Sequence, residues 1–313
     1  MNVLKMKVRS LRFPCLAGIL LAACLSLRAS ENVPHRPFAQ WANLPLPGQW
    51  IVGIVYEESE AYNFWAGGEN HSARYKTGGE SYGIDINQGY IAVEYGIAEK
   101  WAADLNVGAT TTGWRYFSNG DVESTTGLMD VSFGVRYQIF NEAEASCPWT
   151  PTLVFRAGGV LPGTYNQNLA FAPGLRNAAI EPELLLRKHV GWPGFGFYGD
   201  ALFRWNRTSG NDQYITVIGL FQQIQRWELD VGYRHLQTLS GGDIQFDSSD
   251  PTSLVYPRDV RENNDSIEFG FSYKTSKRGI RWGFHSRATF DGNNTDKKFW
   301  LGGSVDFPFG GRK

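Results

Sequence analysis

The feature that most constrains this chain is the period of its apolar residues, which from Trp50 onward recur at every second position over stretches of about ten residues. A period of two is typical of β-strands with one apolar and one polar face, whereas an amphipathic helix repeats every 3.6 residues. The clearest stretch is 227–233, where Trp, Leu, Val and Tyr alternate with Glu, Asp and Gly. Further segments with this alternation begin at Met129, Ile267, Ile280 and Phe299. The pattern predicts an all-β fold.

The composition agrees with strands and narrows the class of protein. The chain has 36 Gly, 11 Trp and 14% aromatic residues, a mixture that favours strands and turns over helices. A net charge of −1 gives no electrostatic footprint for nucleic acid, so no nucleic-acid partner is expected. Two of the 3 cysteines, Cys15 and Cys24, lie near the N-terminus, which leaves Cys147 for the body of the chain. A disulfide framework or a cysteine-ligated zinc site is therefore excluded.

The N-terminus reads as an export signal. A basic start is followed by an apolar run, 13–27, of the length expected for a signal peptide rather than a membrane-spanning helix. We expect residues 1–29 to be the signal peptide, cleaved after Ala29; the alternative is a lipobox at 21–24 whose Cys24 is acylated. No later stretch approaches 18 consecutive apolar residues, which excludes a bundle of transmembrane helices.

The alternation predicts about twelve strands. We place them near 49–58, 81–97, 101–115, 127–140, 151–161, 178–189, 196–206, 213–224, 227–238, 264–275, 280–291 and 297–309. Within the second strand the apolar parity slips from Ile84 and Ile86 to Ile91 and Val93, which predicts a β-bulge around 87–89.

The lengths of the connections favour a membrane barrel over a soluble sandwich. Mostly tight links follow the even-numbered strands, and longer links rich in Gly, Asn, Asp and Ser follow the odd-numbered ones. An even strand count with segregated loop lengths is typical of bacterial outer-membrane barrels, which also carry aromatic residues at both ends of their apolar band. We therefore predict a transmembrane antiparallel up-and-down β-barrel over 49–309 in the outer membrane of a Gram-negative-type bacterium. A short periplasmic segment, 30–48, would precede it and a tail, 310–313, would follow.

The expected partners follow from this placement. They are the lipids of the outer membrane, the barrel-assembly machinery, which reads a terminal aromatic such as Phe309, and a small-molecule solute of unknown identity.

If the apolar face meets lipid, the charged face lines the lumen. The lumen-lining candidates are Asp130, Arg136, Arg156, Glu181, Glu183, Arg187, Asp200, Arg204, Glu228, Asp230, Arg234, Glu268, Arg281 and Arg287. Two interpretations stay open. Ion pairs between strands could fill and close a narrow barrel with a structural or surface-interaction role, or rings of alternating charge could line a path for small molecules.

One group of candidates has a sharper expectation. Residues on neighbouring strands lie within reach of each other across a tilted sheet. We therefore expect one connected ionic patch formed by Glu228, Asp230, Arg234, Glu268, Arg281 and Arg287.

Signals of chemistry are weak. The match to G-x-G-x-x-G at 194–199 is followed by a strand rather than a helix, so it does not predict a dinucleotide site. The five histidines show no H-E-x-x-H spacing. His285 and Ser286 are adjacent and point to opposite faces of a strand, which does not suit a hydrolase dyad. We predict no catalytic residue, no cofactor and no metal.

Four short segments carry a resemblance to a known family. They are 44–50 (LPLPGQW), 95–101 (YGIAEKW), 161–165 (LPGTY) and 305–309 (VDFPF). In them the chain resembles the outer-membrane proteins associated with phenol meta-pathway degradation, loosely similar to long-chain fatty-acid transporters. The resemblance implies a channel or transporter for small, often aromatic or hydrophobic, compounds. The stretch between the signal and Trp50 is too short for the N-terminal hatch of those transporters, and no single binding residue carries over.

Overall fold

The computed structural model describes residues 38–77, 80–115, 122–166, 172–174, 176–207, 211–246, 254–255 and 260–311. The expected signal peptide, the cleavage site after Ala29 and the alternative acylation site at Cys24 lie outside the described residues.

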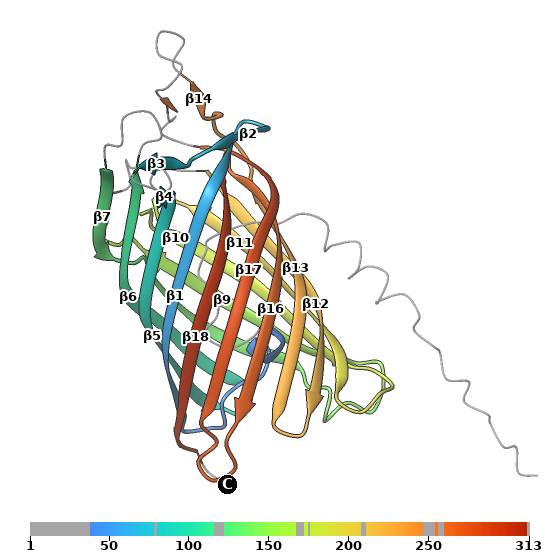
Figure 1. The fold of residues 1–313 in the computed structure, drawn as a ribbon. Coiled ribbons are helices and arrows are strands. Elements are labelled where there is room, and N and C mark those ends of the chain that lie inside the picture. The colour runs from blue at the N-terminus through green and yellow to red at the C-terminus, as the bar shows by residue number, and fades with distance from the viewer. Residues whose placement is uncertain are drawn as a thin grey trace, which may run out of the picture.

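In the described residues twelve antiparallel strands follow one another around a closed barrel (Figure 1). The barrel strands are β1 (Gln49–Ala66), β5 (Ile84–Ala98), β6 (Trp101–Arg115), β8 (Val131–Phe140), β9 (Thr152–Leu161), β10 (Ala179–His189), β11 (Phe195–Asn206), β12 (Gln213–Ile224), β13 (Trp227–Thr238), β16 (Asn263–Lys274), β17 (Arg281–Asn293) and β18 (Asp296–Gly310). The remaining elements are α2 (Phe38–Trp41), β2 (Glu69–Ser72), β3 (Tyr75–Thr77), β4 (Glu80–Tyr82), β7 (Val122–Leu128), β14 (Gln245–Phe246) and β15 (Leu254–Val255). The predicted all-β, twelve-stranded barrel is confirmed.

The last strand closes the barrel against the first. β18 pairs with β1 from Gly310 opposite Gln49 to Lys298 opposite Ala61, and β1 pairs on its other side with β5. β1 continues to Ala66, eight residues beyond the expected end at 58, and its upper part also pairs with β2. The connections that are short in sequence lie together at the lower end in Figure 1, which is the periplasmic end in barrels of this kind.

The outer face carries the apolar band and an aromatic girdle. Large apolar side chains such as Ile218 and Ile267 are exposed on it, as expected of a surface that meets lipid. Near the short-turn end, aromatic rings from neighbouring strands lie side by side. These pairs are Trp50 with Tyr95, Trp101 with Tyr137 and Trp227 with Tyr273, with centroids 4.4, 4.6 and 4.3 Å apart.

The predicted bulge at 87–89 is wrong. β5 pairs without interruption through these residues with both β1 and β6. The parity slip has another cause: at this height the strand rises above the apolar band, so its outer face becomes polar, with Asp85 and Asn87 exposed. Ile84 and Ile86 are buried on the inner face there.

A bulge lies instead between β7 and β8. The pairing with β6 runs from Ala109 opposite Leu128 to Asn106 opposite Ser132, so two residues of β6 face three residues of the other chain segment. The extra residue turns Met129 inward, where it is buried, although the alternation places it on the lipid face with Val131.

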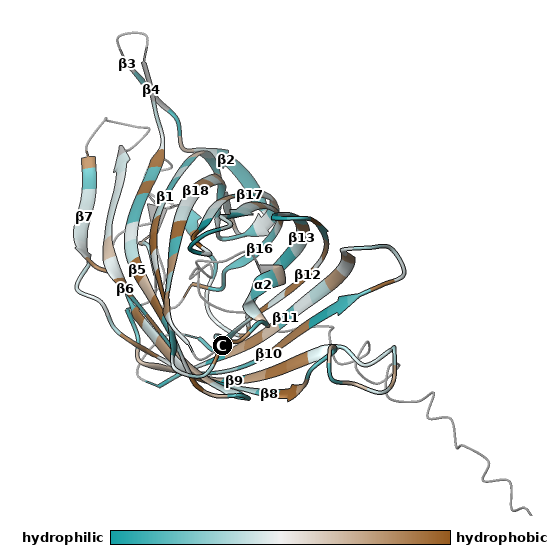
Figure 2. Ribbon diagram, turned by 90° about the horizontal axis from the view of Figure 1, so that it is seen from below, coloured by the Kyte–Doolittle hydropathy of each residue, from teal (hydrophilic) through white to brown (hydrophobic). Residues whose placement is uncertain are grey.

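The segment before β1 enters the barrel. Seen from below, α2 lies within the ring of strands (Figure 2), in contact with β10, β11 and β12. Its residues Ala39 and Trp41, and the following Ala42, are almost fully buried. The described part of the segment 30–48, which we expect in the periplasm, therefore begins inside the barrel, because the small and aromatic side chains of α2 pack against the inner wall. In the described part of the chain, no helix is long and apolar enough to cross a bilayer.

Candidate functional site

Most of the predicted lumen residues are buried inside the barrel. Twelve of the fourteen have almost no exposed surface, namely Arg136, Arg156, Glu181, Glu183, Arg187, Asp200, Arg204, Glu228, Asp230, Arg234, Glu268 and Arg287. The other two, Asp130 and Arg281, are half-buried. Arg281 lies in register with Asp306 of β18 near the periplasmic end. The charged face of the strands therefore forms the wall that the alternation predicts.

Arg156 joins three strands of this wall. Its guanidinium binds Asp104 of β6 through Nε and Nη2, at 3.0 and 2.7 Å, and Glu183 of β10 through Nη1 at 3.2 Å. The side chain lies flat over two glycines, since a Cβ at Gly134 or Gly158 would come within 2.6 Å of it. Glycine on both neighbouring positions thus lets one arginine reach the carboxylates on either side.

The N-terminal segment is held by two further arginines and one glutamate. Arg136 donates through Nη1 to the carbonyl of Trp41 at 2.9 Å, and its guanidinium stacks on the Trp41 ring at 4.2 Å from the centroid. Arg187 donates to the carbonyl of Ala39 and binds Glu228, whose carboxylate also accepts from Gln40. The wall therefore binds the backbone of this segment with the charged groups that the sequence points to.

The expected patch around Arg234 is only partly present. Glu268 lies 3.6 Å from Arg234 Nε and 3.9 Å from Arg287 Nη1, so these three residues are connected as expected. Glu228 is not part of the patch, because it pairs with Arg187 across the lumen-facing side of β10 to β13. For Asp230 no cation of the described residues lies within 4.0 Å. Arg204 of β11 binds Glu181 of β10, on strands two and three places from β13 around the barrel.

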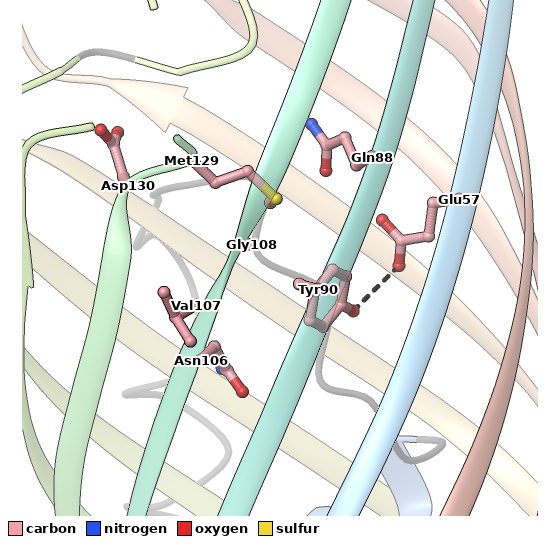
Figure 3. Close-up of a pocket in the computed structure, with 8 residues that line it drawn as sticks. All are labelled: Glu57, Gln88, Tyr90, Asn106, Val107, Gly108, Met129 and Asp130. Atoms are coloured by element: carbon pink, nitrogen blue, oxygen red, sulfur yellow. Dashed lines mark hydrogen bonds between the residues drawn. The ribbon is translucent and has the colours of Figure 1, made fainter. Parts of the chain in front are cut away.

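Asp130 serves the loop between β9 and β10 rather than the inner wall. Its carboxylate accepts from the backbone of Gly163 at 2.8 Å and from the Tyr165 hydroxyl at 2.9 Å. The Met129 side chain extends toward Gly108 and Tyr90, whereas the Asp130 carboxylate points away from them (Figure 3). Asp130 therefore fixes the loop at the seam between β7 and β8.

A small pocket lies beside this bulge (Figure 3). Met129, Gln88 and Tyr90 line it, and the Tyr90 hydroxyl donates to Glu57 Oε1 at 3.1 Å. His285 Nε2 lies 2.9 Å from the same oxygen of Glu57. The sequence did not point to Glu57 as an inner-wall residue because the apolar Val55 lies on the same face of the strand. The signal is the regular alternation of Val55, Glu57 and Ser59, which are buried, with the exposed residues between them.

The extracellular end of the lumen is apolar. Phe64, Ile84 and Trp114, from β1, β5 and β6, form one buried cluster with Ala61 and Ala66. Ile244, from the connection between β13 and β16, packs into this cluster and is 4% exposed. The long connection after β13 therefore covers part of the mouth.

The described residues hold no group of three or more His, Cys, Asp or Glu side chains placed to bind a metal ion. Asp243, in the long connection after β13, binds Arg261 at 3.0 Å.

Comparison with known proteins places this geometry among outer-membrane barrels. The family described as "Putative MetA-pathway of phenol degradation" matches residues 71–299. The structure is similar to that of the COG4313 outer membrane channel from Pseudomonas putida F1, with a TM-score of 0.64, 16% identity, and coverage of 85% of this chain and 97% of that chain.

Two other solved structures are less similar to this one. They are to the translocator domain of the autotransporter NalP from Neisseria meningitidis (TM-score 0.47, 12% identity, 87% and 92% coverage) and to the Pseudomonas putida toluene transporter TodX (0.40, 9%, 88% and 92%). No curated protein matches the chain.

Proposed function

We propose that this chain, which belongs to the phenol-degradation family matched over 71–299, is an outer-membrane channel that admits small molecules through a lumen closed at rest by its own N-terminal segment. One solved structure to which it is similar is that of an outer membrane channel. Outward apolar side chains and the closed hydrogen-bonded ring suit a bilayer, in which every backbone group must be paired.

The observation that carries the proposal is how α2 is held. Its contacts with the wall are hydrogen bonds, such as Arg136 to the carbonyl of Trp41 at 2.9 Å, and side-chain packing such as that of Ala39 against Phe221. Hydrogen bonds to charged groups contribute about 1.5–3 kcal/mol each, so the segment can leave and return. A barrel with only a structural role needs no segment in its lumen that can be displaced.

For the solute we propose a small molecule with an aromatic or otherwise apolar body. The family's description refers to phenol degradation. Phe64, Ile84 and Trp114 form an apolar cluster at the extracellular end, beneath the connection after β13. Once this cover is displaced, the cluster offers such a body an apolar surface.

A second function, a structural barrel with a closed lumen, is favoured by the ion pairs across the wall. Arg156 alone lies within 4.0 Å of Asp104, Glu181 and Glu183. In that case the charges fill the interior and nothing passes.

Single-channel recording in planar bilayers decides between the two. We expect the full chain to show small, intermittent conductance, and a variant lacking residues 38–44 to show a larger and steadier one. Heat modifiability on gels serves as the control for folding of the variant. Folded protein that never conducts, with or without 38–44, would support the structural barrel and refute the channel.

A further inference from the structure

Exposed positive charge at the periplasmic end is concentrated on one side of the barrel. Arg226 lies in the turn between β12 and β13, and Lys277 and Arg278 lie in the turn between β16 and β17; all three are exposed. Neither turn contains an acid. Among the described residues, no carboxylate forms an ion pair with any of the three. Their charge is therefore available to a partner outside the chain.

The two turns are neighbours. β13 pairs with β16, and the backbone N–H of Lys274, the last residue of β16, donates to the carbonyl of Arg226 at 2.9 Å. A backbone hydrogen bond from Thr275 to Ile280, at 2.8 Å, closes the β16–β17 turn. Figure 1 shows the two turns side by side at the lower end of the barrel. With the exposed Lys274, the three cations form one surface, which we name the basic edge (Arg226, Lys274, Lys277 and Arg278).

A row of aromatic rings lies directly above the basic edge on the lipid face. Trp227 of β13 is in register with Tyr273 of β16, which is in register with Trp282 of β17. The two tryptophans are 41% and 56% exposed, and the ring centroids of Trp227 and Tyr273 are 4.3 Å apart. Trp and Tyr side chains mark the level at which the hydrocarbon of a bilayer meets its headgroups. The basic edge begins one residue beyond this row, which places it at the level of the headgroup phosphates in the periplasmic leaflet.

Farther around the rim the charge is reversed. The β8–β9 turn carries Glu142 and Glu144 and has no lysine or arginine. Glu142 is already paired with Lys188 of β10. The β10–β11 turn, 190–194, lies between that turn and the basic edge and is uncharged. An anion at the periplasmic rim is therefore attracted to one sector of the barrel and not to the whole end.

We propose that the basic edge binds the headgroup phosphate of an anionic phospholipid, such as phosphatidylglycerol, in the periplasmic leaflet. Arginine binds phosphate oxygens through paired hydrogen bonds, and lysine binds them as a point charge. The acyl chains of the same lipid lie along the aromatic row and the exposed apolar side chains above it, such as Phe269 and Phe284. The inference goes beyond the proposed function, because it needs the barrel and its orientation in the membrane but no passage of a solute.

The test counts the lipids that stay bound to the full chain, purified in a nonionic detergent, by native mass spectrometry. Phosphatidylglycerol and phosphatidylcholine with the same acyl chains are added in equal amounts. We expect phosphatidylglycerol to be retained about tenfold more, because several cations attract its net negative charge together. This preference should fall as the salt concentration rises, since exposed charges are screened. The triple variant Arg226→Gln, Lys277→Gln and Arg278→Gln should lose it.

The matched control removes three exposed cations elsewhere, by Lys100→Gln, Arg207→Gln and Lys297→Gln in one variant. It changes the net charge by the same amount and should keep the preference for phosphatidylglycerol. Heat modifiability shows whether each variant is folded.

Two results would overturn the proposal. The first is equal retention of the two lipids by the unaltered protein, or an equal loss of the preference in both triple variants. The second is displacement of phosphatidylglycerol by glycerol phosphate at the concentration of the lipid itself, which would indicate a site for a free phosphate compound and not for a lipid. None of these measurements depends on conductance, so they leave the channel to its own test.

Discussion

The side-chain oxygen of Asn294 accepts a hydrogen bond from the backbone N–H of Ile244 at 2.9 Å, which fixes the connection after β13 to the turn between β17 and β18. The same oxygen accepts from the backbone of Gly67 at 2.7 Å, and the side-chain nitrogen donates to Asp243 and to the carbonyl of Arg261 at 2.9 and 2.8 Å. One buried side chain therefore joins three extracellular turns over the apolar mouth.

Replacing Asn294 with Ala should release this connection. Each buried partner left without its hydrogen bond costs about 1–3 kcal/mol, so we expect amide hydrogen exchange at Ile244 and its neighbours to rise by about tenfold or more. Mass spectrometry of the exchanged protein measures this. Asn294 has a φ of 52°, which glycine adopts without strain, so Asn294→Gly separates the two causes. If hydrogen exchange rises in Asn294→Ala but not in Asn294→Gly, the effect comes from backbone strain and not from the lost hydrogen bonds, against the expectation.

Arg156→Ala should destabilise the barrel more than other single changes to the wall. It leaves Asp104 and Glu183 buried without their closest cation, and breaking a buried pair in this way costs about 3–5 kcal/mol. The temperature at which the folded form is lost on gels should fall clearly. Arg156→Lys keeps the charge but not the paired hydrogen bonds, so its unfolding temperature should lie between those of the unaltered protein and Arg156→Ala. Arg226→Ala, at an exposed turn, is the matched control, and equal stability of both Ala variants would contradict the role of Arg156.

The pH dependence of the periplasmic end should depend on Glu142. Partial burial alone would raise the pKa of this carboxyl, but hydrogen bonds from Lys188 and from the backbone and ring of His189 outweigh it and hold the pKa below its usual 4.5. An acid whose pKa is lowered by folding stabilises the folded state above its usual pKa, and this contribution is lost as the pH falls through the lowered value.

We therefore expect the unfolding temperature to fall more between pH 6 and pH 3 in the unaltered protein than in Glu142→Gln. Glu99→Gln at the neighbouring short turn, which is exposed, should behave as the unaltered protein does. Parallel curves for all three proteins would show that Glu142 does not contribute.

Much of the barrel follows from the sequence because a period of two and a turn signal depend on neighbouring residues only. β12 and β13 begin and end at the predicted residues, and in β13 the apolar residues from Trp227 to Tyr233 alternate regularly with polar residues or glycine. β5 misleads because it passes from the lipid band into water while its inner face passes from charge to an apolar cluster. Two real changes of environment thus imitate a bulge.

What the sequence does not reveal depends on contacts between distant segments. The sequence around α2 does not indicate that the carbonyl of Ala39 accepts a hydrogen bond from Arg187, 148 residues away. Nor does it indicate that the carbonyl of Trp41 accepts one from Arg136, 95 residues away. Individual partners are equally hidden: the alternation places Glu228 and Arg234 on one face, but which strand supplies the nearer arginine depends on the tilt of the barrel. The wall was therefore predictable, and its pairing and its occupant were not.

Two arginines share the carboxylate of Glu268. Arg234 and Arg287 approach it from opposite strands, at 3.6 and 3.9 Å, so either arginine alone leaves it one cation. We expect Arg234→Ala and Arg287→Ala each to lower the free energy of unfolding moderately. The double variant, which strips Glu268 of both, should lose about 0.5–3 kcal/mol more than the sum, as residues in one ionic network do. Urea unfolding of the protein in liposomes measures the free energy of unfolding of the unaltered protein, the two single variants and the double variant.

Arg187 and Arg287 provide the matched comparison, because Arg187 binds Glu228 and they share no carboxylate among the ion pairs of the described residues. Losses in that pair of variants should add. Additive losses in the Arg234 and Arg287 pair as well would show that the two arginines act on separate partners, and that the predicted patch does not exist even in its reduced form.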